Sequence, residues 1–183
     1  MIFTPRFDAP SVDDLYWIKT THGGYNRCIL INEETGQVIP NCTGYAWGRF
    51  LEEQGITDCN LSRGNATVWY RNTSDGYNRG QTPKLGAVIC YSGGSDNAGH
   101  VAIVEQINQD GSIIISESTY SGVYFRTKTL YPPFYSWGAS YTLQGFIYPD
   151  INFDGDKLKH RFKWILFSKY QKDKRKITFK HKN

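Results

Sequence analysis

The stretch Pro40-Asn41-Cys42-Thr43-Gly44-Tyr45 decides the fold, because it places one cysteine where a helix begins. An apolar run with helical spacing follows and ends at Gly55, and the side chain of Asn41 or Thr43 can cap the first free backbone N–H groups. Cys42 therefore falls in the first helical turn, where the helix dipole favours a thiolate over a thiol. This pattern predicts a sulfur nucleophile, and the alternative is that Cys42 is a small buried hydrophobic residue.

The composition indicates a β-rich body. The 183 residues include 13 Tyr and 5 Trp but one Met, and aromatic residues are enriched in strands. The length suits one domain, or one domain with an appendage, that buries a core without disulfides. Residues 1–10 carry Arg6, Asp8 and few apolar side chains, so we expect no signal peptide, and no stretch of the sequence is apolar enough to predict a membrane span.

The cysteine spacing predicts neither a metal site nor another cofactor. Cys28, Cys42, Cys59 and Cys90 form no Cys-x-x-Cys pair and have no histidine at a zinc-ligand spacing. The sequence does not decide whether these cysteines form disulfides, although a reducing cytoplasm keeps thiols free. A Cys42 that does chemistry has to be a free thiol.

The charge is divided unevenly along the chain. From Lys157 onward there are eleven basic residues and one acid, a net charge of +10, while residues 1–156 hold ten basic and sixteen acidic residues, a net charge of −6. Pro149 and the Asp, Asn and Gly residues after it mark a boundary. We therefore expect a folded domain over residues 1–149 and a polar linker with a basic, aromatic-containing tail over residues 150–183.

A β-hairpin is predicted downstream of the cysteine helix. Residues 100–107 and 112–119 have strand character and flank the turn dipeptide Asp110-Gly111. The residue opposite His100 falls near residues 117–121, so Glu117 or Thr119 can lie beside the imidazole. Residues 83–91 predict another strand, and residues 144–148 predict a closing strand of the same small antiparallel sheet.

These elements together supply what acyl transfer to a thiol requires. The imidazole of His100 can take the proton of Cys42 and return it to the leaving amine, while the carboxylate of Glu117 holds the ring in the required tautomer. The backbone N–H of Cys42 can bind the oxyanion of the tetrahedral intermediate. The alternative for each residue alone is structural: His100 bonded to a carbonyl, and Glu117 a solvated strand residue.

Four stretches resemble the signatures of CHAP domains, which are cysteine- and histidine-dependent amidohydrolases and peptidases of bacterial peptidoglycan. They are residues 41–49, 85–88, 99–105 and 116–118, and the resemblance as a whole covers about residues 25–148. The resemblance implies an α+β, papain-like fold in which N-terminal helices pack on a small antiparallel β-sheet. It also implies cleavage of an amide bond in wall peptides, by an N-acetylmuramoyl-L-alanine amidase or an endopeptidase.

The resemblance assigns the catalytic roles to Cys42, His100 and Glu117. Many members have an asparagine two residues after that glutamate, and this chain has Thr119, whose hydroxyl keeps part of the fourth role. Such domains are common in phage endolysins, phage tail lysins and bacterial autolysins. With no signal peptide expected, a phage lysin is favoured, released from the host cytoplasm to the wall or carried on a virion. The rival hypothesis is an inactive wall-binding or virion structural module, and it rests on Thr119.

Five aromatic residues are candidates for a substrate groove. They are Tyr45 and Trp47 on the cysteine helix, and Trp69, Tyr120 and Trp137 elsewhere. Core packing is the alternative for each of them. Tyr120 is the first of these to test, because it follows Glu117 and Thr119 closely.

The tail carries two further hypotheses. Residues 150–156 have the opening spacing of a calcium-binding EF-hand loop, but Arg161 stands where a bidentate glutamate is needed, so we expect a linker. The lysines and aromatic residues beyond it can target teichoic acid or anionic lipid phosphates, and the alternative is a solvated basic extension. Nucleic acid is not expected as a partner.

Overall fold

The computed structural model describes residues 2–11, 14, 19–20, 30–32, 38–120, 122–151 and 153. Contacts divide the chain into two compact units, one comprising Thr4–Ile151 and the other comprising Met1–Phe3 and Asn152–Asn183. In the second unit the rings of Phe3 and Phe153 meet edge to face, with centroids 4.9 Å apart. Cys28 and the basic tail from Lys157 onward lie outside the described residues, so the hypotheses about them stay predictions.

The Thr4–Ile151 unit holds helices and two β-sheets. Its helices are α1 (Cys42–Gln54) and α2 (Ala66–Trp69), with short 3-10 helices η1 (Thr73–Asp75) and η2 (Ser95–Asn97). A three-stranded sheet contains β1 (Lys19–Thr20), β2 (Leu30–Asn32) and β3 (Val38–Ile39). A six-stranded sheet contains β4 (Arg79–Gly80), β5 (Val88–Gly93), β6 (His100–Ile107), β7 (Ile113–Thr119), β8 (Val123–Leu130) and β9 (Tyr141–Ile147). In the described ranges, no helix has the length and apolar character needed to cross a membrane.

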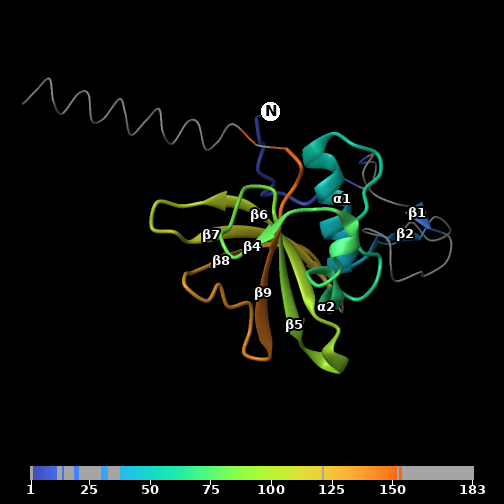
Figure 1. Ribbon diagram of the computed structural model, residues 1–183. Helices are drawn as coiled ribbons and strands as arrows, with labels where there is room; N and C mark the ends of the chain where they lie inside the picture. The colour runs from blue at the N-terminus through green and yellow to red at the C-terminus, as the bar shows by residue number, and fades with distance from the viewer. Residues whose placement is uncertain are drawn as a thin grey trace, which may run out of the picture. The chain divides into compact units, whose positions relative to one another are not determined.

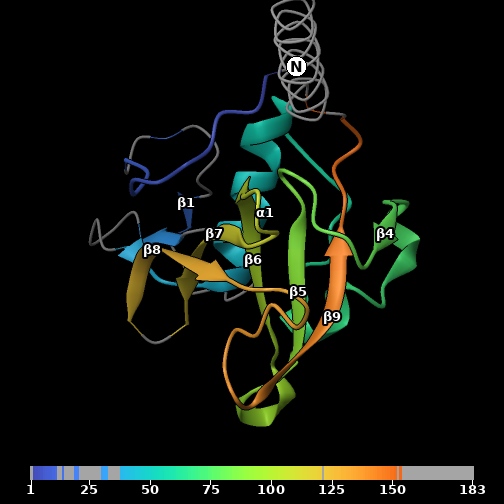
Figure 2. The same ribbon diagram turned by 90° about the vertical axis from the view of Figure 1, so that its left-hand side faces the viewer.

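The six-stranded sheet confirms the predicted α+β class. Its strand order is β4-β9-β5-β6-β7-β8, and every neighbouring pair is antiparallel. Figures 1 and 2 show α1 against one face of this sheet, where it contacts β6 and β7. The predicted hairpin is confirmed as β6 and β7, and the predicted closing strand as β9. The arrangement is that of helices from the N-terminal half packed on an antiparallel sheet.

The strand predicted over residues 83–91 begins later than expected. β5 starts at Val88, because the chain turns before it: the N–H of Ala87 donates to the carbonyl of Lys84, and Gly86 has a φ of +74°. The strand then continues to Gly93, beyond the predicted end. The glycine in this segment is therefore a turn residue and not a strand residue.

Helix α1 begins and ends where its capping residues predict. Asn41 is the N-cap, and its side chain accepts hydrogen bonds from the N–H groups of Thr43 and Gly44. Gly55 ends the helix in the left-handed conformation at φ +64°, with its N–H donating to Glu52. Of the two capping residues that the sequence allowed, Asn41 is the one that is used.

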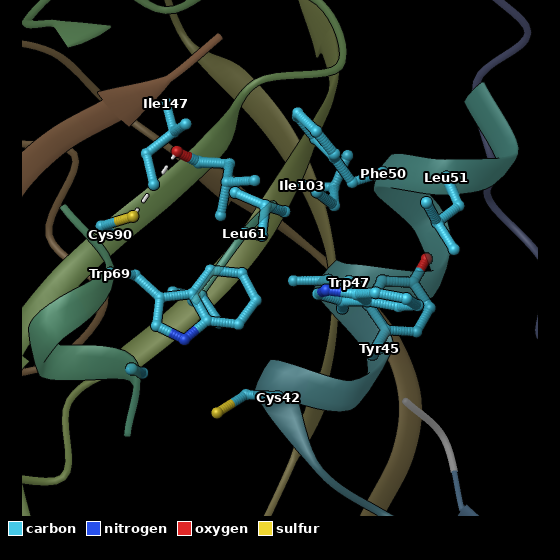
Figure 3. Packing of buried hydrophobic residues seen from close by; sticks show 14 residues of the cluster. Cys42, Tyr45, Trp47, Phe50, Leu51, Leu61, Trp69, Cys90, Ile103 and Ile147 are labelled. Atoms are coloured by element: carbon cyan, nitrogen blue, oxygen red, sulfur yellow. Dashed lines mark hydrogen bonds between the residues drawn. The ribbon is translucent and has the colours of Figure 1, made fainter. Parts of the chain in front are cut away.

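The central strands are buried on both faces, so alternate residues face two separate apolar clusters. The cluster beside α1 (Figure 3) takes Val88, Cys90, Val101 and Ile103 from β5 and β6, and packs them against Phe50, Leu51 and Trp69. The opposite cluster takes Ile89, Tyr91, Ala102 and Val104, and packs them against Tyr135 and Phe146. Strands of this kind carry continuous apolar runs and no polar alternation.

A buried ion pair fixes α1 on the sheet. Arg49 of α1 makes two hydrogen bonds of 2.9 Å to the carboxylate of Glu105 in β6, and the two side chains are 4% and 0% exposed. The hydroxyl of Ser116 on β7 donates to the same carboxylate at 2.6 Å, and Tyr45 of α1 donates to that hydroxyl at 2.7 Å. Glu105 also stands at a register irregularity of β6. The helix, β6 and β7 are thus joined by one polar network inside the core.

Candidate active site

A cavity of about 510 Å³ opens where α1 begins, where β6 begins and where β7 ends. Both the cysteine and the histidine predicted from sequence line it, and so does Thr119. The remaining lining comes from Asn41, Thr43, Gly64, Asn65, Ala66, Ser95, Ala98, Gly99, Tyr120, Trp137 and Tyr141. Apart from Cys42 and His100, none of the lining residues is an acidic or basic residue. The cavity therefore brings the predicted nucleophile and base to one wall of a mostly uncharged space.

Cys42 is the first residue of α1 and lies at the margin of the core. Figure 3 shows its sulfur directed away from Tyr45 and Trp47. The cap formed by Asn41 satisfies the N–H groups of Thr43 and Gly44 and leaves the N–H of Cys42 without a hydrogen bond in the described part of the chain. A donor of this kind at a helix N-terminus is suited to an oxyanion.

His100 is placed by the glycine before it. Gly99 has a φ of +76°, and a Cβ there would lie 2.3 Å from the backbone nitrogen of Thr67 and 2.5 Å from the carbonyl oxygen of Tyr91. Any other residue would push β6 away from these segments, so Gly99 sets the position at which the strand starts. His100 lies opposite Tyr91 across β5 and β6, and alternation places it on the sheet face away from α1. Because it is the first residue of its strand, it still reaches Cys42 at the end of the sheet.

The imidazole of His100 lies between the thiol and the carboxylate. Nε2 lies 2.6 Å from Oε2 of Glu117, and Cys42 is near enough to raise the pKa of the ring. Since Nε2 is engaged by the carboxylate, Nδ1 is the ring nitrogen left for the sulfur. The structure thus brings Cys42, His100 and Glu117 together, with His100 in the middle.

The charges of His100 and Glu117 stabilise each other. Burial lowers the pKa of His100, but hydrogen bonds and charges of Cys42 and Glu117 outweigh it and raise the pKa to about 9. Burial raises the pKa of Glu117, but the hydrogen bond and charge of His100, with hydrogen bonds from Arg126 and Trp137, hold it below its ordinary value. At neutral pH His100 is therefore an imidazolium that faces an ionised Glu117.

Two further residues hold Glu117, and the sequence did not reveal them in this role. Arg126 of β8 donates from Nε to Oε1 at 2.6 Å, and Trp137 donates from Nε1 to Oε2 at 2.5 Å. Arg126 lies directly opposite Glu117 in the pairing of β7 with β8. Only that register could have identified it, because β8 was not delimited as a strand in the sequence.

The predicted groove aromatics separate into two groups. Tyr120 and Trp137 line the cavity, and Tyr120 is 59% exposed. Tyr45, Trp47 and Trp69 are corrected to core residues, because they are 0%, 6% and 1% exposed and belong to the apolar cluster beside α1. The rings of these three residues therefore contribute to core packing and do not line the cavity.

Thr119 lines the cavity beside Tyr120. Its hydroxyl oxygen accepts a hydrogen bond from the N–H of Val123 at 3.3 Å, which leaves the hydroxyl proton able to donate elsewhere. In the described ranges no group of three or more His, Cys, Asp or Glu residues is arranged to hold a metal ion.

Comparison with protein families and curated proteins identifies the same region of the chain. The CHAP domain model matches residues 32–119. The probable autolysin SsaALP of Staphylococcus aureus is 32% identical over 102 residues, which cover 55% of this chain and 37% of that protein. The N-acetylmuramoyl-L-alanine amidase sle1 of Staphylococcus aureus is 28% identical over 109 residues, which cover 56% and 29%. The chain thus matches about a third of the length of these relatives.

Solved structures give matches over part of the chain. An N-acetylmuramoyl-L-alanine amidase from Staphylococcus aureus is 34% identical with a TM-score of 0.42, covering 49% of this chain and 26% of that one. Ly7917 with the hydrolysis product of MDP is 20% identical with a TM-score of 0.45, covering 61% and 55%. The phage origin expected from sequence stays a prediction. The stretch of this chain that matches the CHAP domain family, residues 32–119, encloses Cys42, His100 and Glu117.

Proposed function

We propose that this chain hydrolyses an amide bond of bacterial peptidoglycan, with Cys42 as the nucleophile. The observation that carries the proposal is that Cys42 and His100 lie together on the wall of the cavity, with the buried carboxylate of Glu117 bonded to the imidazole behind them. The family match and the relatives named autolysin and N-acetylmuramoyl-L-alanine amidase support peptidoglycan as the substrate.

The reaction follows from the positions of these groups. The thiolate of Cys42 attacks the carbonyl carbon of the amide, and the oxyanion that forms binds the free N–H of Cys42. The imidazolium of His100 gives its proton to the amine as the C–N bond breaks, which leaves a thioester on Cys42. The neutral imidazole then takes a proton from water, whose oxygen attacks the thioester, and collapse of the second tetrahedral intermediate releases the acid and regenerates the thiolate beside the imidazolium. Glu117 keeps the ring in place through both steps.

Two bonds of the wall fit this chemistry. An N-acetylmuramoyl-L-alanine amidase cuts between the lactyl group of the sugar and the stem peptide, and an endopeptidase cuts within the peptides. The cavity offers neutral walls and the aromatic side chains of Tyr120, Trp137 and Tyr141, which suit either substrate. Mass spectrometry of the muropeptides released from purified walls distinguishes the two activities.

The basic tail extends the proposal to wall targeting. Its net charge of +10 from Lys157 onward supports binding to the phosphates of teichoic acid or of anionic lipids. A truncation after Pro149 should bind walls more weakly than the full chain at low salt and equally at high salt. Equal binding at low salt would contradict the targeting role and would leave the catalytic proposal intact.

The test of the catalytic proposal is a zymogram on purified cell walls. Wild type should clear the walls, Cys42→Ala should not, and Cys59→Ser serves as the matched control because Cys59 is another free thiol outside the cavity lining. Clearing by Cys42→Ala would refute the assignment of the nucleophile. A wild type that binds walls but clears none would favour the inactive binding module.

A further inference from the structure

The carboxylate of Glu117 is fully enclosed and receives three hydrogen bonds. Oε2 lies 2.6 Å from Nε2 of His100 and 2.5 Å from Nε1 of Trp137, and Oε1 lies 2.6 Å from Nε of Arg126. The Glu117 side chain is 0% exposed, whereas that of Arg126 is 41% exposed. A buried carboxylate with three donors has little freedom to rotate, so the direction in which it holds His100 is fixed by Trp137 and Arg126.

The indole of Trp137 also covers the ring that Glu117 holds. The rings of His100 and Trp137 are stacked, with centroids 4.1 Å apart and planes inclined by 29°. Tyr141 meets the indole edge to face at 4.5 Å, and Lys128 donates from Nζ to the carbonyl of Trp137. One side chain therefore contacts the imidazole with its ring face and the carboxylate with its N–H, and it is itself held on two sides.

Within the described residues, few other charged groups surround His100. The groups found there to face it are Cys42 from α1, Tyr91 from β5, Glu117 from β7 and Tyr141 from β9. Arg126 and Lys128 of β8 lie over the indole, with centroid distances of 5.8 Å and 5.2 Å. Of these two cations, Arg126 is the one that bonds to the carboxylate. It is therefore placed to balance the negative charge that would otherwise face the imidazolium alone.

We propose that Trp137 and Arg126 are positioning residues of the active site, which act on Cys42 only through His100 and Glu117. Trp137 aligns the imidazole and the carboxylate with each other, and Arg126 fixes the second carboxylate oxygen. The effect of this positioning on catalysis rests on the proposed function, whereas the alignment of His100 and Glu117 exists without substrate. It also assigns Trp137 a role beyond its place in the cavity lining.

The test measures the reactivity of Cys42 without any wall substrate. Iodoacetamide alkylation is followed by peptide-level mass spectrometry from pH 5 to 10 in a Cys59→Ser background, so that the Cys42 peptide is measured separately from the peptides of Cys28 and Cys90. Trp137→Phe keeps a stacking ring and loses the N–H donor, and should lower the alkylation rate at pH 6 about tenfold, as expected for loss of one hydrogen bond to a charged group. Thr129→Ala, an exposed change on β8, is the matched control and should react as wild type.

The Arg126 variants test the second half of the proposal by NMR titration of His100. Arg126→Gln removes the balancing charge, so the pKa of His100 should move upward. Arg126→Lys keeps the charge and should restore the wild-type titration. An unchanged or lowered pKa in Arg126→Gln, with wild-type near-ultraviolet circular dichroism, would overturn the role of Arg126.

The two proposals fail in distinguishable ways. If Trp137→Phe alkylates at the wild-type rate at every pH but clears walls poorly, Trp137 acts on the substrate and the positioning role is overturned. If wild type clears no walls while Trp137→Phe still lowers the reactivity of Cys42, the proposed function fails and the positioning role stands. A folded Trp137→Leu variant, which loses ring and donor together, should react more slowly than Trp137→Phe, and a faster reaction would contradict the stacking argument.

Discussion

The proton held by His100 should make the folded chain less stable as the pH rises. Burial lowers the pKa of this residue, but the hydrogen bonds and charges of Cys42 and Glu117 raise it from 6.5 to about 9. A proton bound more tightly in the folded chain than in the unfolded chain contributes stability that is fully present below about pH 6.5 and is lost as the pH passes about 9. Converted at about 1.36 kcal/mol per pKa unit, this contribution is on the order of 3 kcal/mol. It is a large part of a typical free energy of unfolding of about 5–15 kcal/mol.

Urea unfolding of wild type and of His100→Gln, followed by tryptophan fluorescence at pH 6 and at about pH 9.5, measures this contribution. Burial raises the pKa of Cys90 and of Tyr91, so these groups also make stability depend on pH in the alkaline range. They are present in both proteins, and their effect cancels in the difference between wild type and variant. That difference should shrink by on the order of 3 kcal/mol between the two pH values. Two proteins that lose the same stability within about 1 kcal/mol would refute the argument, since His100 would then not hold its proton through Cys42 and Glu117.

Four further outcomes are expected. The rate of wall clearing should be nearly flat around neutral pH and should fall above about pH 9, as the imidazolium of His100 that protonates the leaving amine is lost; a rate that rises through pH 9 would contradict this. Gly99→Ala should cost at least about 2 kcal/mol in urea unfolding and should reduce activity, because its Cβ meets two backbone segments. Arg49→Met should cost roughly 3–5 kcal/mol by leaving Glu105 buried without its partner, and a double variant with Glu105→Gln should recover part of that loss. Tyr45→Phe should lower the free energy of unfolding by about 1 kcal/mol, because one hydrogen bond is lost, and should leave wall clearing unchanged. Reduced clearing by a fully stable variant would indicate that Tyr45 contacts the substrate.

The parts of the fold that the sequence predicted depend on local signals. Asn41 and Gly55 mark the ends of α1 because capping involves residues only a few positions apart. The Asp110-Gly111 turn sets the hairpin, and this turn with the strand alternation is enough to predict Glu117 within reach of His100, where the structure has it. Cys42 and its base were therefore predictable as a pair, although they are distant in the sequence.

The parts that the sequence did not predict depend on contacts between distant segments. Arg126 becomes a partner of Glu117 only through the pairing of β7 with β8, and Trp137 reaches the site from the segment between β8 and β9. Burial is equally nonlocal: Trp69 and Trp137 have the same chemistry, yet one is in the core and the other lines the cavity. Composition could name the aromatic candidates but could not separate them.

The site lies at the end of the sheet because its two halves approach from different faces. Helix α1 packs on one face and presents Cys42 at its N-terminus, while alternation along β6 places His100 with Tyr91 on the other face. Within the sheet such residues would be separated by the strands themselves, and only at the first residue of β6 is there no strand between them. Gly99 sets that first residue, so a shift of β6 by one position would turn the imidazole away from the thiol. The same arrangement lets Trp137 cover His100 and leave Cys42 open. The indole packs with the apolar cluster on the sheet face opposite α1, whereas Cys42 belongs to α1.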